Sequence, residues 1–302
     1  MSITNPVYID LKKNKLIFDK NLITISKGTR DSKINVLKDK KENIIFLQKY
    51  ITGHNYYLDV KNNDKRSLSN KSQKKINHVY TKKGNIITSY LNDDERRKKN
   101  LNKFFVGKDI LDFGCGWGNF LIKIKNAKSK NGVEVGSDFI QHLKKKKIRI
   151  KKDISDFDMN FDYITLFHVL HYLPNQIEIL KILKSKLKKK GKIIIEVPNA
   201  NDFLLSTDVF KAFKNFTFCK EQLILHTEKS LKLFVKKAGF RNIKVNFYQR
   251  YNINNHFGWF FYNKPGGHQF LKNLFNKNMI KNYSEFLKKK KITDTLILTA
   301  QK

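Results

Sequence analysis

Cysteine is scarce in this chain of 302 residues, which contains only Cys115 and Cys219. Two cysteines exclude a disulfide framework and a cysteine-rich zinc site, and they fit a reducing compartment. No run of about 18 apolar residues could span a bilayer, and the polar first residues lack the apolar segment of a secretory signal. We therefore expect a cytoplasmic protein without a metal site, and contact with a membrane surface stays open.

Acidic residues are few beside the basic ones: 26 Asp and Glu face 62 Lys and Arg, a net charge of +36. Such an excess is typical of proteins that bind nucleic acid or anionic membranes. Here the lysines are spread along the whole chain together with Asn and Ile, as in a protein from an AT-biased genome. We interpret most of the charge as compositional, and the lysine runs 144–147 and 288–291 as solvated helix ends.

The N-terminal part contains short apolar segments between polar turns. These segments, at 8–11, 15–19, 22–26 and 43–50, predict β-strands. The polar stretch 61–80 predicts a linker or loop. We therefore expect a β-rich region with a linker over residues 1–88.

From residue 89 onward the sequence predicts alternating helices and strands, the pattern of an α/β protein with a parallel sheet. Before the final strands, Thr227 predicts the start of an amphipathic helix. The predicted strands are 109–114, 131–136, 148–154, 161–167, 192–199, 242–251 and 293–302. The predicted helices are 89–105, 118–127, 138–147, 174–190, with Gly191 just past its end, and 227–240.

The stretch DILDFGCGWGNF, residues 109–120, places three glycines after a short strand. A dinucleotide fingerprint needs a third glycine where this chain has Asn119, and a P-loop needs a Gly-Lys-Ser/Thr sequence that is absent. The pattern that remains is Asp112 followed by Gly114, Gly116 and Gly118. A carboxylate at that strand end would repel pyrophosphate and attract an ammonium or sulfonium group.

Further candidate binding residues lie at the ends of the next three predicted strands. Glu134 is placed to accept hydrogen bonds from ribose hydroxyls, and Asp153 to accept one from an adenine amino group beside the apolar Ile154. Phe167 and His168 would form a wall of the same pocket.

These motifs, together with KIIIEVPNANDFL at 192–204, resemble the core of class I S-adenosylmethionine-dependent methyltransferases. The resemblance covers roughly residues 90–250. It implies a Rossmann-like fold with a mostly parallel seven-stranded sheet, one antiparallel strand and helices on both faces. It also implies S-adenosylmethionine as cofactor, with the glycines at its methionine part, Glu134 at the ribose, and Asp153 and Ile154 at the adenine. The methyltransferase domain would then be 89–302.

The C-terminal half resembles a bacterial methyltransferase subgroup associated with sugar and surface-polysaccharide biosynthesis. The similar stretches include YQRYNINNHFGWF and NKPGGH, and the chain departs from the usual pattern at His171, Cys219 and Gln222. Residues 252–291 form an insert between the last two strands, which we expect to be a lid or substrate wall. Its His256 and His268 are candidate bases. Candidate acceptor-binding residues are Asn199, Asp202, Tyr251, Trp259, Gly266 and Gly267.

The function predicted is methylation of a hydroxyl on a sugar, glycan intermediate or other small molecule. An RNA methyltransferase with a basic surface is the alternative. This alternative is weakened by the end of the fourth strand. Enzymes that methylate the amino groups of nucleic acid bases carry an Asn/Asp-Pro-Pro-aromatic motif there, and this chain has LFHVLHYLP. A binding protein with a degenerate core is disfavoured by the intact acidic and glycine positions, and oligomeric state is left open.

Overall fold

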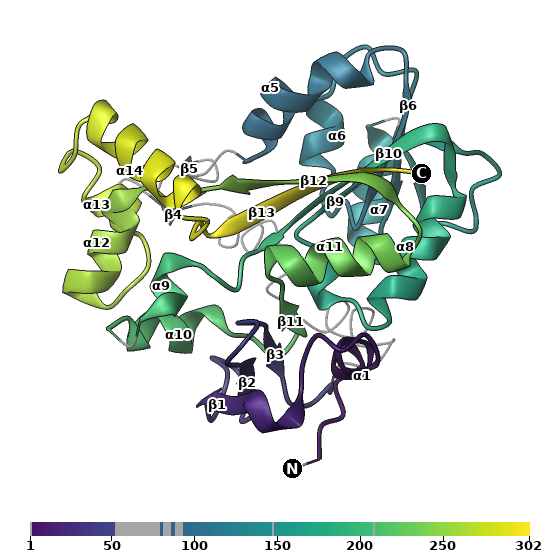
Figure 1. Cartoon of the computed structure of the whole chain (residues 1–302). Helices are drawn as coiled ribbons and strands as arrows, with labels where there is room; N and C mark the ends of the chain where they lie inside the picture. The colour runs from purple at the N-terminus through teal and green to yellow at the C-terminus, as the bar shows by residue number, and fades with distance from the viewer. Residues whose placement is uncertain (1, 52–78, 81–85, 88–92, 147, 208) are drawn as a thin grey trace. The chain divides into compact units, whose positions relative to one another are not determined.

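The computed structural model describes residues 2–51, 79–80, 86–87, 93–146, 148–207 and 209–302. It divides into two compact units, each built from separate stretches of the chain, which Figure 1 colours by residue number. The first unit takes Met1–Ile51, His168–Lys184 and Ile195–Gln301, and the second takes Thr52–Phe167, Ser185–Ile194 and Lys302. Most of the predicted linker over 61–80 lies outside the described residues.

The second unit is built on parallel strands. β6 pairs in parallel with both β7 and β9, and β7 pairs with β8. The strand order is β10-β9-β6-β7-β8. The bounds are β6 (Asp109–Phe113), β7 (Ser129–Val133), β8 (Arg149–Lys151), β9 (Phe161–Phe167) and β10 (Leu187–Pro198), and β10 continues into the first unit.

Three described helices of this unit are α5 (Asp93–Phe105), α6 (Asn119–Lys123) and α7 (Ser137–Lys145). α5 carries three acids in its first turn, as the helix dipole favours. Its buried Phe105 meets the rings of Phe120 and Tyr163 edge-on. α6 is shorter than predicted because Ile124 already has extended dihedral angles. A short β4 (Val79–Tyr80) pairs with β5 (Ile86–Ile87).

The N-terminal residues of the first unit form an antiparallel sheet in the order β1-β2-β3-β11, with β1 (Leu22–Ser26), β2 (Val36–Asp39), β3 (Ile45–Leu47) and β11 (Ile224–Leu225). The strands predicted at 22–26 and within 43–50 are confirmed. The strand predicted at 8–11 is wrong, because this segment lies in helix α1 (Pro6–Lys13). The Asn5 side chain caps α1 and Pro6 is at its first position, a helix-start signal. The strand predicted at 15–19 is also wrong, because residues 15–18 form a turn and coil before the short helix η1 (Asp19–Asn21).

The first unit also contains the antiparallel pair β12 (Arg241–Tyr248) and β13 (Thr295–Gln301), in the order β12-β13-β10. Because β10 is common to both orders, the sheet has seven strands, and the predicted α/β fold with one antiparallel strand pair is confirmed. Helix α8 (Gln176–Ser185) ends earlier than predicted, since 187–190 already belong to β10. The remaining elements here are η2 (Leu170–Tyr172) and α11 (Glu228–Lys237), which begins in a capping box at the predicted Thr227.

Residues between β12 and β13 fold into three helices, α12 (Ile253–Tyr262), α13 (Gly267–Phe270) and α14 (Lys277–Lys289), which gather together in Figure 1. Two shorter helices, α9 (Phe203–Ser206) and α10 (Lys211–Thr217), follow β10. A side chain on Gly258 would lie 2.6 Å from the Cα of Gly267, so the backbones of α12 and α13 are in direct contact. Trp259 of α12 shares a small core with Leu204 and Phe210.

Candidate functional site

The glycine turn, residues 114–118, connects β6 to α6. Gly114, Gly116 and Gly118 have φ angles of +73°, +52° and +66°, which glycine adopts without strain. The N–H groups of Gly114 and Cys115 both donate to the carbonyl of Val133 at the end of β7, over 2.8 and 3.1 Å. Backbone hydrogen bonds therefore fix the turn against the neighbouring strand.

Two glycines of the turn serve different purposes. A Cβ at Gly118 would lie 2.2 Å from Cδ2 of Leu143, so a side chain there would have to displace the buried Leu143 of α7. A Cβ at Gly116 would have no described atom within 4 Å. Gly116 thus keeps space clear beside the backbone, which fits the nucleoside cofactor expected from the sequence.

Glu134 meets the glycine turn directly. Its Oε2 accepts a hydrogen bond from the N–H of Gly116 at 2.9 Å, across 18 residues of sequence. Its Oε1 accepts from the N–H groups of Val135 and Gly136 at 2.9 and 3.0 Å. Two parts of the predicted cofactor site, the turn and the second-strand acid, are therefore in contact within the second unit.

Asp112 is almost fully buried at the end of β6. Its Oδ1 accepts a hydrogen bond from Oγ1 of Thr165 at 2.7 Å. Burial raises the pKa of Asp112 to about 7, against the opposing effects of Thr165 and Arg97. A cation beside this carboxyl would stabilise its ionised form, so its protonation is sensitive to a charged ligand.

The residues predicted at the adenine follow β8. Ile154 is buried, whereas Asp153 is exposed. The Asp153 Oδ1 accepts hydrogen bonds from the backbone N–H and the hydroxyl of Ser155, at 2.8 and 2.7 Å. This carboxylate therefore holds the turn after β8 in addition to any contact with a base.

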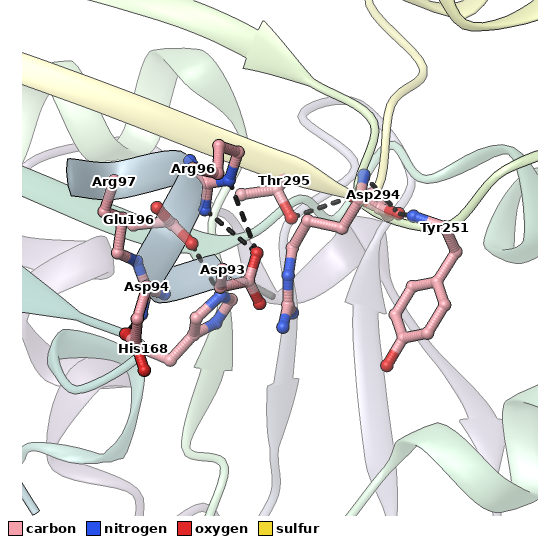
Figure 2. A network of polar contacts seen from close by, with 10 residues as sticks. Asp93, Asp94, Arg96, Arg97, His168, Glu196, Tyr251, Asp294 and Thr295 are labelled. Carbon is pink, nitrogen blue, oxygen red and sulfur yellow. Dashed lines mark hydrogen bonds and ion pairs between the residues drawn. The ribbon is translucent and has the colours of Figure 1, made fainter. Parts of the chain in front are cut away.

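Phe167, the last residue of β9, contacts a cation that the sequence reading missed. The guanidinium of Arg97 lies 4.3 Å from its ring centroid. Arg97 also pairs with Asp94 at 3.1 Å, one turn earlier on α5 (Figure 2). The sequence gives no local signal for this contact, because Arg97 and Phe167 are 70 positions apart.

The first unit contains a cavity of about 400 Å³. Of the predicted residues it brings together His168, Asp202, Tyr251, His256, Trp259, Gly266 and His268. Residues that the sequence reading did not assign to a site also line it, namely Arg30, His171, Tyr172, Cys219, Gln222, Arg250, Asn255 and Asp294, with apolar side chains from α9 and α10. Asn199 and Gly267 are not among the lining residues, and the amide of Asn199 donates to the carbonyl of Thr293 at 2.8 Å.

Asp294, just before β13, is a half-buried acceptor of several hydrogen bonds. It accepts from the backbone N–H groups of Arg250 and Tyr251, from the Gln249 amide and from the Thr295 hydroxyl, at 2.8 to 3.1 Å (Figure 2). Burial raises the pKa of Asp294, whereas the nearby Arg250 and these four donors favour its ionised form.

Asp202 has fewer partners than Asp294. Its Oδ1 accepts a hydrogen bond from the N–H of Leu204 at 2.9 Å and so caps α9. Burial and the nearby Asp294 charge hold the pKa of Asp202 well above its usual range. Of this pair, we therefore assign the proton to the buried Asp202 and the charge to Asp294.

Both predicted base candidates are neutral at pH 7, because burial lowers the pKa of His256 to about 3 and of His268 to about 4. His256 has both ring nitrogens in contact with side chains: Nδ1 lies 2.7 Å from the hydroxyl of Tyr283 and Nε2 lies 3.2 Å from the amide of Gln249. His268 Nδ1 donates to Oδ1 of Asn255 at 3.1 Å, which leaves Nε2 as the unprotonated nitrogen of the neutral ring.

His171 is the least expected residue of the cavity wall. It is 1% exposed, and its Nδ1 has no hydrogen-bond partner among the described residues. Burial, with the nearby His168, His226 and Arg250, holds the pKa of His171 well below its ordinary value. Unpartnered buried polar atoms are uncommon, so this nitrogen marks a place where a ligand could bind. The only sequence signal was that His171 departs from the pattern of similar proteins.

His168 begins the second stretch of chain in the first unit and is predicted at the cofactor. Its φ of +56° is unusual for a residue with a side chain, and its Nε2 lies 3.1 Å from Oε1 of the buried Glu196 (Figure 2). Its backbone N–H donates to the carbonyl of Glu196 at 2.8 Å. These contacts hold the ring at the cavity wall.

Among the described residues, no group of three or more His, Cys, Asp or Glu could hold a metal ion. In the same part of the chain, no helix is both long enough and apolar enough to span a bilayer.

Comparison with known proteins shows which family the chain belongs to. The family model described as "Methyltransferase domain" matches residues 88–245, slightly more than half of the chain. A tRNA U34 carboxymethyltransferase of Campylobacter fetus is 26% identical over 165 residues, covering 48% of this chain and 56% of that protein. A demethylmenaquinone methyltransferase of Staphylococcus saprophyticus is 26% identical over 202 residues, covering 56% and 86%.

A SAM-dependent methyltransferase structure from Archaeoglobus fulgidus aligns with a TM-score of 0.46 at 22% identity, covering 69% of this chain and 94% of that one. The chain spans 56% of the length of the tRNA-modifying relative and 65% of a relative from Methanocaldococcus jannaschii, which is 28% identical and covers 45% of this chain. The family match includes the glycine turn, Glu134 and β9. The chain therefore belongs to the methyltransferase domain family.

Proposed function

We propose that this protein uses S-adenosylmethionine to methylate a hydroxyl of a sugar, a glycan intermediate or another small molecule. The cofactor would bind in the second unit, and the acceptor in the cavity of the first.

The observation that carries the proposal is the contact between Gly116 and Glu134, beside the open face of the turn. The turn backbone would take the methionine part, and Glu134 the ribose. Asp112 would lie near the cationic part, and Asp153, Ile154 and Phe167 near the adenine. The bound cofactor would supply a methyl group already activated by the sulfonium, so the chain mainly has to position the acceptor, an effect worth about 7–11 kcal/mol.

The acceptor cavity supports a small molecule. Its volume of about 400 Å³ lies within the roughly 300–1,000 Å³ of small-molecule pockets. Aromatic walls from Tyr251 and Trp259 and polar groups from Asp202 and Gln222 suit the mixed faces of a sugar. The buried Nδ1 of His171 would gain a partner from an acceptor hydroxyl.

His268 is our choice for the base that accepts the hydroxyl proton. It is neutral at pH 7 and lines the cavity, and Asn255 fixes its tautomer. His256 is better placed to position the wall, because both of its nitrogens already contact Tyr283 and Gln249.

RNA methylation is the second candidate, favoured by the net charge of +36 and by relatives named as tRNA carboxymethyltransferases. It is the weaker one, because the lysines are spread along the chain and the acceptor cavity has the size of a small-molecule pocket.

Two measurements test the proposal. Calorimetry should detect binding of S-adenosylmethionine to the folded protein, and its absence would refute the cofactor assignment. Transfer of a tritiated methyl group should then be measured on nucleotide sugars, glycan extract and total RNA. We expect label in the sugar or glycan fraction, and label in RNA alone would replace the first candidate by the second.

A further inference from the structure

Large apolar side chains are exposed at high density between residues 260 and 286. This stretch holds seven of the seventeen exposed large apolar side chains of the described residues, each 46–59% exposed. They are Phe260, Phe261, Tyr262, Phe270, Leu274, Met279 and Phe286, which we call the aromatic tip. Exposed apolar patches of this kind mark interaction sites.

The C-terminal end of α12 is exposed on more than one side. Phe260, Phe261 and Tyr262 are consecutive and each more than half exposed. Since successive helix residues are about 100° apart, these three cover about 200° of the circumference. Tyr262 meets Phe270 of α13 edge-on, with ring centroids 5.3 Å apart, so the two helices share one apolar end.

α14 also carries exposed apolar side chains. Met279 and Phe286 are seven residues apart, hence on one side of the helix, and about half exposed. Leu287, by contrast, is fully buried. The helix therefore presents one apolar side to its own unit and a second one outward.

The segment that forms the aromatic tip is rich in lysine. Residues 252–291 contain eight lysines and one glutamate. The Nζ of Lys264 lies 5.1 Å from the ring centroid of Phe270 and 5.7 Å from that of Tyr262. Lys272, Lys277 and Lys281 are exposed along the following segment. Exposed aromatic side chains with lysines among and after them in the sequence match a bilayer interface, where the rings enter the headgroup region and the amines face anionic lipid.

We propose that the aromatic tip docks this protein on a membrane that carries anionic lipids. A nucleic acid fits less well, because it requires a basic groove with ring faces available for stacking. Here the rings lie at the end of a helix and pack edge-on: Phe260 meets Phe261 at 87°, and Tyr262 meets Phe270 at 89°.

The helix that forms the tip also lines the cavity. Asn255, His256 and Trp259 of α12 are cavity residues, and the exposed end follows at once. The ten residues of α12 span about 15 Å. If the cavity binds the acceptor as proposed above, docking brings its wall to the lipid surface, where a lipid-linked acceptor would be found.

The test is sedimentation of the full chain with vesicles of phosphatidylcholine alone or with about 30% phosphatidylglycerol, an anionic lipid that gives the vesicles a negative surface potential. We expect binding to the anionic vesicles. Phe260→Ser/Phe261→Ser/Phe270→Ser should weaken it about 100-fold, since each half-exposed ring contributes about five-fold. The matched control is Ile9→Ser/Phe104→Ser/Ile182→Ser, whose side chains are equally exposed elsewhere, and it should bind like the wild type.

Charge is tested separately. Lys264→Gln/Lys272→Gln should weaken vesicle binding about 25-fold, at about five-fold per lysine, whereas Lys144→Gln/Lys145→Gln on α7 should have little effect. Equal losses of vesicle binding in the tip and control variants would overturn the proposal. So would vesicle binding at the wild-type level by Phe260→Ser/Phe261→Ser/Phe270→Ser. If the tip variant lost binding to total RNA but kept its binding to vesicles, the tip would be an RNA-binding surface instead. None of these measurements depends on methyl transfer, so failure here leaves the proposed function untouched.

Discussion

The glycine turn and the cavity of the first unit are built in opposite ways. The turn uses backbone N–H groups and positive φ angles within five residues, and one acid 18 residues further on. The cavity collects side chains from Arg30 to Thr295. A site made from backbone depends on a short motif, whereas a site made from distant side chains depends on the whole tertiary structure. The two sites should therefore respond to separate mutations.

The largest effect is expected at Gly116. Gly116→Ala places a methyl group in the open face of the turn, and we expect binding of S-adenosylmethionine to weaken at least about 100-fold, or about 2.7 kcal/mol, by calorimetry. Gly107→Ala is the matched control, because Gly107 also has a positive φ and open space around it. Both variants should lose about 1–2 kcal/mol of stability, and only Gly116→Ala should lose the cofactor. Equal binding by the two variants would contradict the assignment.

On the cavity side we expect His171→Phe to lower kcat/KM for methyl transfer about 10–100-fold while cofactor binding is unchanged. It should also raise the free energy of unfolding by about 1 kcal/mol, since it removes an unpartnered buried nitrogen.

The control for that variant is His226→Phe. His226 is equally buried, but its nitrogens contact Gln176 at 2.8 Å and Ser230 at 3.1 Å. Its replacement should lower stability by about 2 kcal/mol. Chemical denaturation distinguishes the two, and the same sign for both would show that the Nδ1 of His171 is satisfied in solution.

Asp112 predicts a pH dependence of cofactor binding. Because its pKa is about 7, the carboxyl is mostly protonated below pH 7 and must lose that proton to face a cation. Affinity should be about ten-fold weaker at pH 6 than at pH 8, and Asp112→Asn should bind weakly at both. Because the folded pKa lies above the unfolded one, ionisation also costs stability as pH rises from about 4 through 7. A flat affinity profile in the wild type would reject this role.

The smallest effect is expected at Asp202. Asn caps a helix as well as Asp does, so Asp202→Asn should keep α9 intact and remove the repulsion with Asp294. Because the pKa of Asp202 is raised, the stabilising effect of its proton is lost as the pH rises. The variant should gain about 1 kcal/mol over the wild type in urea unfolding at pH 9 and almost nothing at pH 5. Asp294→Asn, which disturbs four donors, should lose stability at both pH values.

The sequence predicted the second unit better than the first. Apolar runs and glycine positions located β6, β7 and β9 because both are local signals. Residues 8–11 were misread because IDL alternates like a strand, while Asn5 and Pro6 start a helix. The end of α8 was misplaced because lysine favours helix in general, and pairing into β10 overrides that preference at 187–190.

The cavity was predicted only where one segment contributed to it. Tyr251, His256 and Trp259 lie close together in the sequence and were named as site candidates. Arg30 and Gln222 are 192 positions apart and meet only through the fold of the first unit. His171 stood out as an unusual residue, but its missing partner can be seen only when its neighbours are in place.

The contact between Gly258 and Gly267 gives the insert a mechanical property. A Cβ on Gly267 would lie 2.3 Å from the carbonyl oxygen of Asn254, so no side chain separates the two helices at this contact. His268 follows Gly267 directly and is hydrogen-bonded to Asn255. A force on the aromatic tip would therefore displace α12, α13 and the proposed base His268 together.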